Sequence, residues 1–263
     1  MSECNTLRHT LAEGGIAVGV SCATGNVHAT ELFARSDLDY VYLDQQHGLV
    51  SFDTVVNQLR TFAGRRTTPL VRVLRNDAGL IGQVLDAGAH GVIVPMVNSV
   101  EEAERAVAAC RYQPAGVRSW GPIRAAFGLG TDPATVDAEV LCLVMVETRG
   151  GLEEVERIAA VPGVDGIYIG PSDLAVSMGL GPGIAFQEGA HARAIARIRA
   201  ACDAAGKVTG ASGDPVELVE QGFRMVTGGS ETGFLGAGLA RVLERRDTAR
   251  RFADSVEEER ATT

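Results

Sequence analysis

The sequence of 263 residues contains almost no lysine and few cysteines. Lys207 is the only lysine among 24 basic residues, so an enzyme that forms a Schiff base through an amine would have a single candidate nucleophile here. The five cysteines are widely spaced and form no CxxC pair, which argues against a disulfide framework and against a thiolate zinc site. This cysteine usage is typical of a protein of the reducing cytoplasm.

Basic charge and long apolar runs are also scarce. The net charge is −9, from 33 acidic against 24 basic residues, which disfavours a nucleic-acid backbone or an anionic membrane as a partner. No apolar run approaches the roughly 20 residues of a membrane helix, and Glu3, Arg8 and Glu13 interrupt the stretch where a signal peptide would be apolar. The sequence therefore predicts a cytoplasmic protein that binds neither nucleic acid nor membrane.

Hydrophobic residues make up 46% of the chain and recur in short, β-branched runs with helical patterns between them. This alternation is typical of repeated βα units around a parallel sheet. Eight such runs in 263 residues predict a closed (β/α)8 TIM barrel in one domain over residues 1–263. The predicted strands are Ile16–Val20, Tyr40–Leu43, Leu70–Val73, Val92–Val94, Leu141–Val146, Gly166–Ile169, Val208–Gly210 and Phe223–Val226.

Capping residues and composition predict the segments between the strands. Ser99, with Glu102 three residues later, forms a capping box before a helix that reaches Cys110. The segment 111–137 is long and rich in Gly and Pro, so we expect it to cover the mouth of the barrel. The segment 241–263 is highly charged, and we expect it to be helical with a frayed end.

The active site of a parallel barrel lies at the carboxyl ends of its strands, so residues that directly follow the apolar runs are the candidates. Glu147 and Asp173 follow the fifth and sixth predicted strands, one βα unit apart, and are expected to meet at one rim. Two carboxylates, completed by waters or substrate oxygens, commonly hold Mg²⁺ or Mn²⁺. The alternative is that both acids merely stabilise the amino ends of the following helices, by roughly 0.3 to 1 kcal/mol each.

Three further candidates belong to the second and third runs. Asp44 and His47 follow the second run, and a carboxylate near an imidazole can raise its basicity for proton transfer near neutral pH. A turn histidine with a capping aspartate is the alternative. Arg72 lies within the third run, where an inward guanidinium needs an anion such as a substrate carboxylate, an enolate oxygen or a nearby acid. An Arg72 that points outward to the helix layer is the alternative.

Two glycine-containing turns are candidate anion sites. The turn Gly170–Asp173 begins a helix, and the backbone N–H groups of a helix start are a natural seat for an anion. Glycines near Gly228 offer a weaker candidate for phosphate, since glycine is also common in ordinary turns. Lys207 precedes the seventh run and is therefore expected at the opposite rim, which disfavours Schiff-base chemistry.

Several of these segments together resemble the HpcH/HpaI family of class II, metal-dependent pyruvate aldolases. The resemblance extends from about Gly14 to about Gly238, and the motifs around Glu147 and Asp173 are specific at their spacing. The matching segments are YVYLDQQHG (40–48), PLVRV (69–73), GVIVPMV (91–97), VET (146–148) and IGPSDL (169–174).

The resemblance implies a carbon–carbon lyase that cleaves a 4-hydroxy-2-oxo acid into pyruvate and an aldehyde through a metal-stabilised enolate. It implies that Glu147 and Asp173 bind a divalent cation, Mg²⁺, Mn²⁺ or Co²⁺. It also implies that Arg72 polarises the keto oxygen and binds the substrate. By the same resemblance, His47 and Asp44 form the acid/base pair, which acts through water.

The resemblance further implies that backbone amides of Ser172 and Asp173, in the turn that begins at Gly170, hold the pyruvate carboxylate. Members of the family are often hexamers in which subunits exchange C-terminal helices, so we expect a homo-oligomer. Two positions depart from the family pattern. Gln46 stands where many aldolases have Glu, and Met145 stands where many have Gln.

Related alternatives are an oxaloacetate decarboxylase and an enolate-trapping enzyme of the macrophomate-synthase type, both of which use the same enolate. An alternative of another class is a noncatalytic barrel that binds a 2-oxo acid and lost turnover through Gln46 and Met145. We favour the enzyme because the five main candidate side chains are all present, namely Asp44, His47, Arg72, Glu147 and Asp173.

Overall fold

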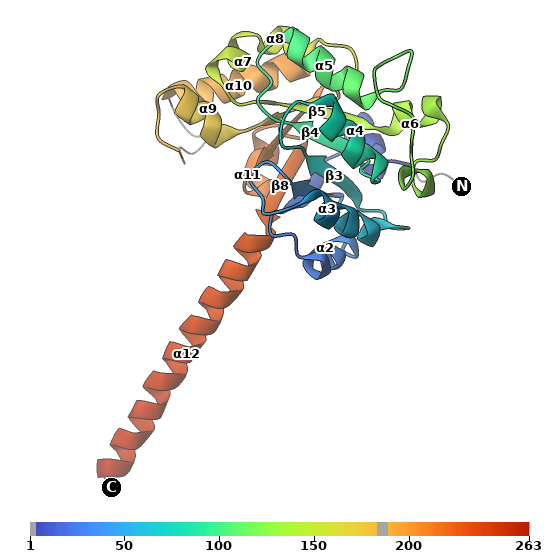
Figure 1. Cartoon of the computed structure of the whole chain (residues 1–263). Helices are drawn as coiled ribbons and strands as arrows, with labels where there is room; N and C mark the ends of the chain where they lie inside the picture. The colour runs from blue at the N-terminus through green and yellow to red at the C-terminus, as the bar shows by residue number, and fades with distance from the viewer. Residues whose placement is uncertain (1–3, 183–188, 263) are drawn as a thin grey trace.

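The computed structural model describes residues 4–182 and 189–262 and contains a closed barrel of eight parallel strands (Figure 1). Each strand pairs with the next along the chain, and β8 pairs with β1 to close the barrel. The predicted (β/α)8 fold is confirmed, and each of the eight predicted runs forms a strand. The strands are β1 (Ala17–Cys22), β2 (Tyr40–Asp44), β3 (Thr68–Arg72), β4 (Gly91–Val94), β5 (Leu141–Val146), β6 (Gly166–Ile169), β7 (Val208–Ser212) and β8 (Met225–Ser230).

Helices surround the barrel (Figure 1), and α5 begins at the predicted capping residue. Ser99 Oγ accepts a hydrogen bond from the Glu102 backbone N–H at 3.2 Å, which satisfies an amide that the helix start leaves unpaired. The helices are α1 (Thr6–Ala12), α2 (Val27–Ala34), α3 (Phe52–Leu59), α4 (Ala78–Asp86), α5 (Val100–Cys110), α6 (Pro133–Glu139), α7 (Arg149–Glu153), α8 (Val155–Ala159), α9 (Pro171–Ser177), α10 (Gly189–Ala204), α11 (Pro215–Glu220), α12 (Glu231–Thr262) and the short 3-10 helices η1 (Arg60–Phe62) and η2 (Ala125–Phe127).

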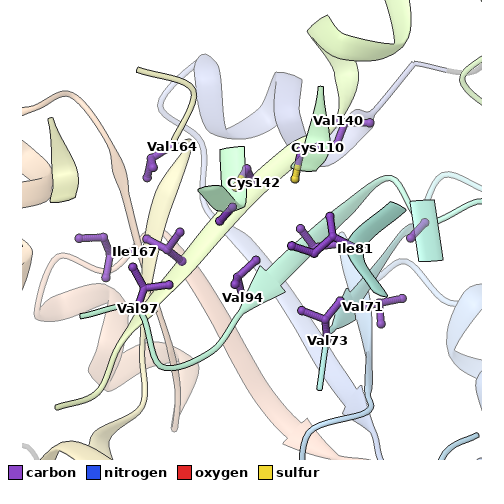
Figure 2. Close-up of a cluster of buried hydrophobic side chains, with 14 of the residues drawn as sticks. Val71, Val73, Ile81, Val94, Val97, Cys110, Val140, Cys142, Val164 and Ile167 are labelled. Carbon is purple, nitrogen blue, oxygen red and sulfur yellow. The ribbon is translucent and has the colours of Figure 1, made fainter. Parts of the chain in front are cut away.

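The larger apolar cluster fills the space between the barrel and the helices. Figure 2 shows part of it, including Val94, Cys142 and Ile167 from three neighbouring strands. These side chains occupy alternate strand positions, because successive residues of a strand point to opposite faces. Burying one Val, Leu or Ile side chain stabilises the fold by about 1.5 to 3 kcal/mol. The positions of opposite parity point into the barrel.

A second apolar cluster lies inside the barrel, and α1 closes it at the amino ends of the strands. Leu7 and Leu11 of α1 pack with the inward side chains. The backbone N–H of Leu7 donates to Thr68 Oγ1, at the start of β3, at 3.2 Å. The side-chain amide of Asn5 donates to the carbonyl oxygen of His90, directly before β4, at 2.9 Å. The amino-terminal end is therefore filled, and the polar candidates lie at the carboxyl-terminal opening.

The prediction that segment 111–137 covers the mouth of the barrel is wrong. The Arg118 guanidinium donates to Asp86 Oδ1 at 2.6 Å, and Arg124 Nη2 donates to the carbonyl oxygen of Leu59 at 2.9 Å. Asp86 and Leu59 end α4 and α3, which precede strands. The segment therefore packs near the amino ends of the strands. The length and composition of the segment predict a long connection. The contacts with Asp86 and Leu59 decide which end of the barrel the segment approaches.

The C-terminal helix α12 has 32 residues and projects away from the barrel (Figure 1). Its first turns contact β1 and β8 of the barrel. The ring of Phe234 also lies 5.8 Å from the ring of Phe33 in α2. Within the described residues, no helix combines the length and apolar character needed to cross a membrane. Fraying of the end of α12 stays a prediction. Exposed apolar side chains occur along the helix, namely Phe234, Leu235, Leu239, Val242, Leu243 and Phe252.

Candidate active site

Strand alternation brings three predicted site residues to the inside of the carboxyl-terminal rim. The interior cluster includes Tyr42 of β2, Leu70 of β3 and Met145 of β5. Because side chains alternate along a strand, the residue two positions after each of these has the same inward parity. These residues are Asp44, Arg72 and Glu147.

Asp44 and Arg72 form a buried, bidentate ion pair. Arg72 Nε donates to Asp44 Oδ1 at 2.8 Å, and Arg72 Nη2 donates to Asp44 Oδ2 at 2.6 Å. Burial by itself would lower the pKa of Arg72, but the hydrogen bonds to Asp44 and the electrostatic contributions of Asp44, Tyr42 and Tyr168 together raise it, so the guanidinium stays charged. The guanidinium carbon also lies 5.5 Å from the centroid of the Tyr42 ring, within the range of a cation–π contact. Arg72 therefore points inward, and Asp44 is the anion that it needs.

Asp44 also organises the turn that follows β2. Its Oδ1 accepts hydrogen bonds from the backbone N–H groups of Gln46 at 3.0 Å and His47 at 3.3 Å. Asp44 thus contacts His47 through the backbone, while the imidazole is exposed. The structure does not bring the imidazole against the Asp44 carboxylate, because Arg72 and the two amides engage that carboxylate instead. Gln46 Oε1 is buried without a hydrogen-bond partner in the described part of the chain.

Glu147 directly follows β5 and is 1% exposed. Its Oε1 accepts from the backbone N–H of Met96 at 2.7 Å, whereas its Oε2 has no hydrogen-bond partner within residues 4–182 and 189–262. Burial raises the pKa of Glu147, and the negative charge of Asp173 adds to that rise. The Met96 amide and the charge of Arg72 oppose it. A buried carboxylate oxygen without a partner costs free energy unless a proton or a cation compensates it.

Two backbone positions hold Glu147 in place. Met96 presents its N–H with a φ of 57°, in the left-handed region that residues other than glycine rarely adopt. A Cβ at Gly170 would overlap Glu147 Oε2, so a side chain there would displace the carboxylate. The sequence did not predict a role for Met96, because no local sequence pattern predicts a positive φ at a methionine. The motif at 91–97 was the one available sign.

Asp173 and Ser172 lie in the first turn of α9, and both are exposed. Glu147 and Asp173 are close enough to interact electrostatically, so two like charges share this part of the rim. A divalent cation would relieve their repulsion. The described residues hold no cluster of three or more His, Cys, Asp or Glu side chains arranged for a metal. A cation bound by these two carboxylates would therefore complete its coordination with water or substrate oxygens.

The chain matches a known family over most of its length. The family model for HpcH/HpaI aldolase/citrate lyase matches residues 21–236. A hydroxypyruvate/pyruvate aldolase from Rhizorhabdus wittichii is 37% identical over 224 residues, which cover 83% of this chain and 89% of the relative. A 5-keto-4-deoxy-D-glucarate aldolase from Klebsiella pneumoniae subsp. pneumoniae is 33% identical over 236 residues, which cover 87% of this chain and 91% of the relative.

The solved structures agree as well. A HpcH/HpaI aldolase/citrate lyase family protein from Burkholderia cenocepacia J2315 has a TM-score of 0.85 and 31% sequence identity, covering 92% of this chain and 99% of its own. The relatives are covered over nearly their whole length, so the match includes the barrel and its rim. The resemblance seen in the sequence is confirmed: this enzyme belongs to the HpcH/HpaI aldolase/citrate lyase family.

Proposed function

We propose that this enzyme is a divalent-metal-dependent pyruvate aldolase that cleaves a 4-hydroxy-2-oxo acid into pyruvate and an aldehyde. The proposal depends above all on Glu147 Oε2, which is buried and has no hydrogen-bond partner among the described residues. A second carboxylate, that of Asp173, lies near it. Hard oxygen donors in this number are typical ligands of Mg²⁺ or Mn²⁺ that keep positions open for water and substrate.

Glu147 and Asp173 would hold Mg²⁺, Mn²⁺ or Co²⁺. When bound, the ion supplies a Lewis acid that stabilises negative charge on the keto oxygen, by several kcal/mol. The near-absence of lysine agrees, because metal chemistry of this kind needs no amine. Lys207 lies directly before β7, at the amino-terminal side of the barrel.

Arg72 would donate to the keto oxygen while that oxygen gains negative charge. Asp44 binds Nε and Nη2 of the guanidinium, which fixes its plane, and does not use Nη1. A preorganised donor of this kind contributes about 3 to 4 kcal/mol to transition-state stabilisation. Asp44 would therefore act as a positioning residue for Arg72 as well as for the turn that carries His47.

The remaining rim residues would bind the carboxylate and move the proton. Backbone amides of Ser172 and Asp173, in the turn that begins at Gly170, would bind the pyruvate carboxylate. His47 would take the proton of the substrate 4-hydroxyl through a water molecule as the C3–C4 bond breaks and the aldehyde carbonyl forms. The electron pair of that bond passes into the enolate, and C3 then takes a proton to become the methyl group of pyruvate.

A second copy of the chain would cover α12. A projecting helix with exposed apolar side chains is stabilised when another protein surface buries those side chains. We expect a homo-oligomer, hexameric as the family resemblance implies, with α12 exchanged between subunits. Light scattering should give a mass well above the 27.6 kDa of one chain. A monomer at micromolar concentration would contradict this part of the proposal.

Metal depletion tests the reaction. Purified enzyme is treated with EDTA, and release of pyruvate from a 4-hydroxy-2-oxo acid is followed before and after addition of Mg²⁺, Mn²⁺ or Co²⁺. We expect activity to depend on the ion and to fall at least about a hundredfold in Glu147→Gln and Asp173→Asn. Glu104→Gln, at an exposed position of α5, is the matched control and should retain full activity.

Two results would contradict the proposal. Pyruvate release that survives removal of the metal would exclude metal dependence. Turnover of oxaloacetate with no cleavage of any 4-hydroxy-2-oxo acid would identify a decarboxylase instead.

A further inference from the structure

The carboxyl-terminal opening has a second half whose chemistry differs from that of the charged half. A pocket of about 350 Å³ lies at the ends of β1, β7 and β8. Every side chain in its lining carries a hydroxyl group, and the rest of the lining is glycine backbone. We call this the hydroxyl pocket, and its side chains are Ser21, Ser212, Thr227 and Ser230.

Two buried tyrosines hold the hydroxyls of this pocket. The Tyr168 hydroxyl donates to Thr227 Oγ1 at 2.7 Å and shares a 2.7 Å hydrogen bond with Ser212 Oγ. The Tyr40 hydroxyl lies 2.8 Å from Thr227 Oγ1. Burial raises the pKa of both tyrosines above the ordinary value, so both remain neutral phenols that can donate and accept hydrogen bonds.

The hydroxyl protons of this network determine which donors and acceptors it presents to a ligand. Because Tyr168 donates to Thr227, Ser212 has to donate to Tyr168, which leaves the Ser212 oxygen with lone pairs for a donor. Tyr40 is completely buried, so a hydroxyl proton without an acceptor would cost free energy. We therefore assign Tyr40 as the donor in its hydrogen bond to Thr227 Oγ1. The Thr227 proton is then left to be donated. The network therefore offers one acceptor and one donor, which is the complement of a ligand hydroxyl group.

The hydroxyl pocket and the charged half share one opening. The Tyr168 ring packs edge-on against the Tyr42 ring with centroids 6.1 Å apart. The Arg72 guanidinium lies over the Tyr42 ring at 5.5 Å. Two tyrosine rings thus connect the hydroxyls to the arginine that faces the keto oxygen in the proposed reaction. A substrate that begins at Arg72 and extends across these rings would reach the hydroxyl pocket with its far end.

The structure argues against phosphate as the ligand here, although many barrels bind phosphate after the last two strands. Glu231 begins α12 directly after Ser230 and is 2% exposed. Its Oε2 accepts from the Thr24 backbone N–H at 3.1 Å, and its Oε1 has no hydrogen-bond partner among the described residues. A buried carboxylate at a helix start repels a phosphate group, so a neutral hydroxylated ligand fits better than the phosphate suggested by the glycines near Gly228.

We propose that the hydroxyl pocket binds the aldehyde half of the substrate and makes the enzyme selective for hydroxylated aldehydes over alkyl aldehydes of the same length. Thr227 and Ser212 would be the specificity-determining residues. The proposal rests on the aldolase function proposed above and names the class of aldehyde that this function would use.

The test compares two aldehydes in two kinds of variant. Aldol addition of pyruvate is measured with glyceraldehyde and with propanal, which have the same carbon chain. In Thr227→Val, which keeps the volume and removes the hydroxyl, we expect kcat/KM for glyceraldehyde to fall about tenfold or more while kcat/KM for propanal changes less than about twofold. Thr61→Val, in η1, is the matched control and should change neither value.

Ser212→Ala repeats the test at an exposed strand end, so it gives an answer even if Thr227→Val fails to fold. Exchange of pyruvate methyl protons with D₂O, measured without aldehyde, reports formation of the enolate alone. Normal exchange with an equal loss for both aldehydes would overturn the pocket proposal and leave the proposed function intact. Preference for glyceraldehyde 3-phosphate over glyceraldehyde would also overturn it. Absence of exchange in the metal-supplied wild-type enzyme would overturn both proposals.

Discussion

The two ends of the barrel differ in chemistry although the same eight strands form both. At the amino-terminal end, Leu7 and Leu11 fill the barrel with apolar side chains. At the carboxyl-terminal end, Asp44, Arg72 and Glu147 are buried or half-buried with their charges. Apolar burial stabilises the fold, whereas buried charge has to be compensated by a partner. Inside the barrel, the amino-terminal end therefore adds apolar burial that stabilises the fold, whereas the carboxyl-terminal end holds charges that require partners.

Arg72→Lys should have the largest effect and should separate the two ends most clearly. Lysine keeps the positive charge beside Asp44 but loses the planar, bidentate geometry. We expect kcat to fall about 10³-fold with little change in the free energy of unfolding. Steady-state kinetics and urea unfolding of the same preparation measure both quantities. A kcat within threefold of wild type would remove Arg72 from the proposed mechanism.

Leu7→Ala should show the opposite behaviour at the closed end. Leu7 is completely buried, so truncation leaves a cavity and should lower the free energy of unfolding by about 2 to 5 kcal/mol. The activity per folded molecule at 25 °C should be unchanged. Leu32→Ala, at a residue of α2 that is 58% exposed, is the control and should change stability by less than about 0.5 kcal/mol. A large loss of kcat in Leu7→Ala would show that the ends are coupled.

Gly170→Ala should weaken metal binding without unfolding the barrel. The added Cβ would overlap Glu147 Oε2 and displace the carboxylate. We expect the affinity for Mn²⁺, measured by calorimetry, to fall about 10- to 100-fold. Gly82→Ala in α4, where a Cβ meets no atom within 4 Å, is the matched control and should bind Mn²⁺ normally. Equal affinities in the two variants would argue against Glu147 as a ligand.

His90, at the closed end, should produce the smallest effect, a dependence of stability on pH. The pKa of His90 is lowered from 6.5 to about 4, mainly by burial; the charge of Glu139 opposes the shift, and the charge of Arg124 adds to it. The unfolded chain therefore takes up the proton first, so stability is complete above pH 6.5 and is lost as the pH falls towards 4. The loss between pH 8 and pH 5 should be about 2 kcal/mol.

Urea midpoints measured across that range check this expectation. His90→Gln should flatten the curve, while His28→Gln, at an exposed position of α2, should leave its slope unchanged. A wild-type curve that is already flat would show that His90 does not titrate as its burial requires.

The strands and rim candidates could be predicted because their signals are local. Apolar, β-branched runs have few alternatives to buried strands, and the residue after each run lies at the rim by chain connectivity. The inward direction of Arg72 required one further step, the alternation of side chains along β3. The position of segment 111–137 could not be predicted in this way, because it depends on contacts with Asp86 and Leu59 that are distant in sequence.

The sequence by itself determined a (β/α)8 barrel and the chemical types of the residues at its open end. Only the tertiary structure decided which of those residues meet. It pairs Asp44 with Arg72 instead of the His47 imidazole, and it gives Met96 the backbone conformation that presents an amide to Glu147. The reason is physical: strand formation follows from local patterns, whereas hydrogen bonding and charge compensation depend on distances that exist only after the barrel has closed.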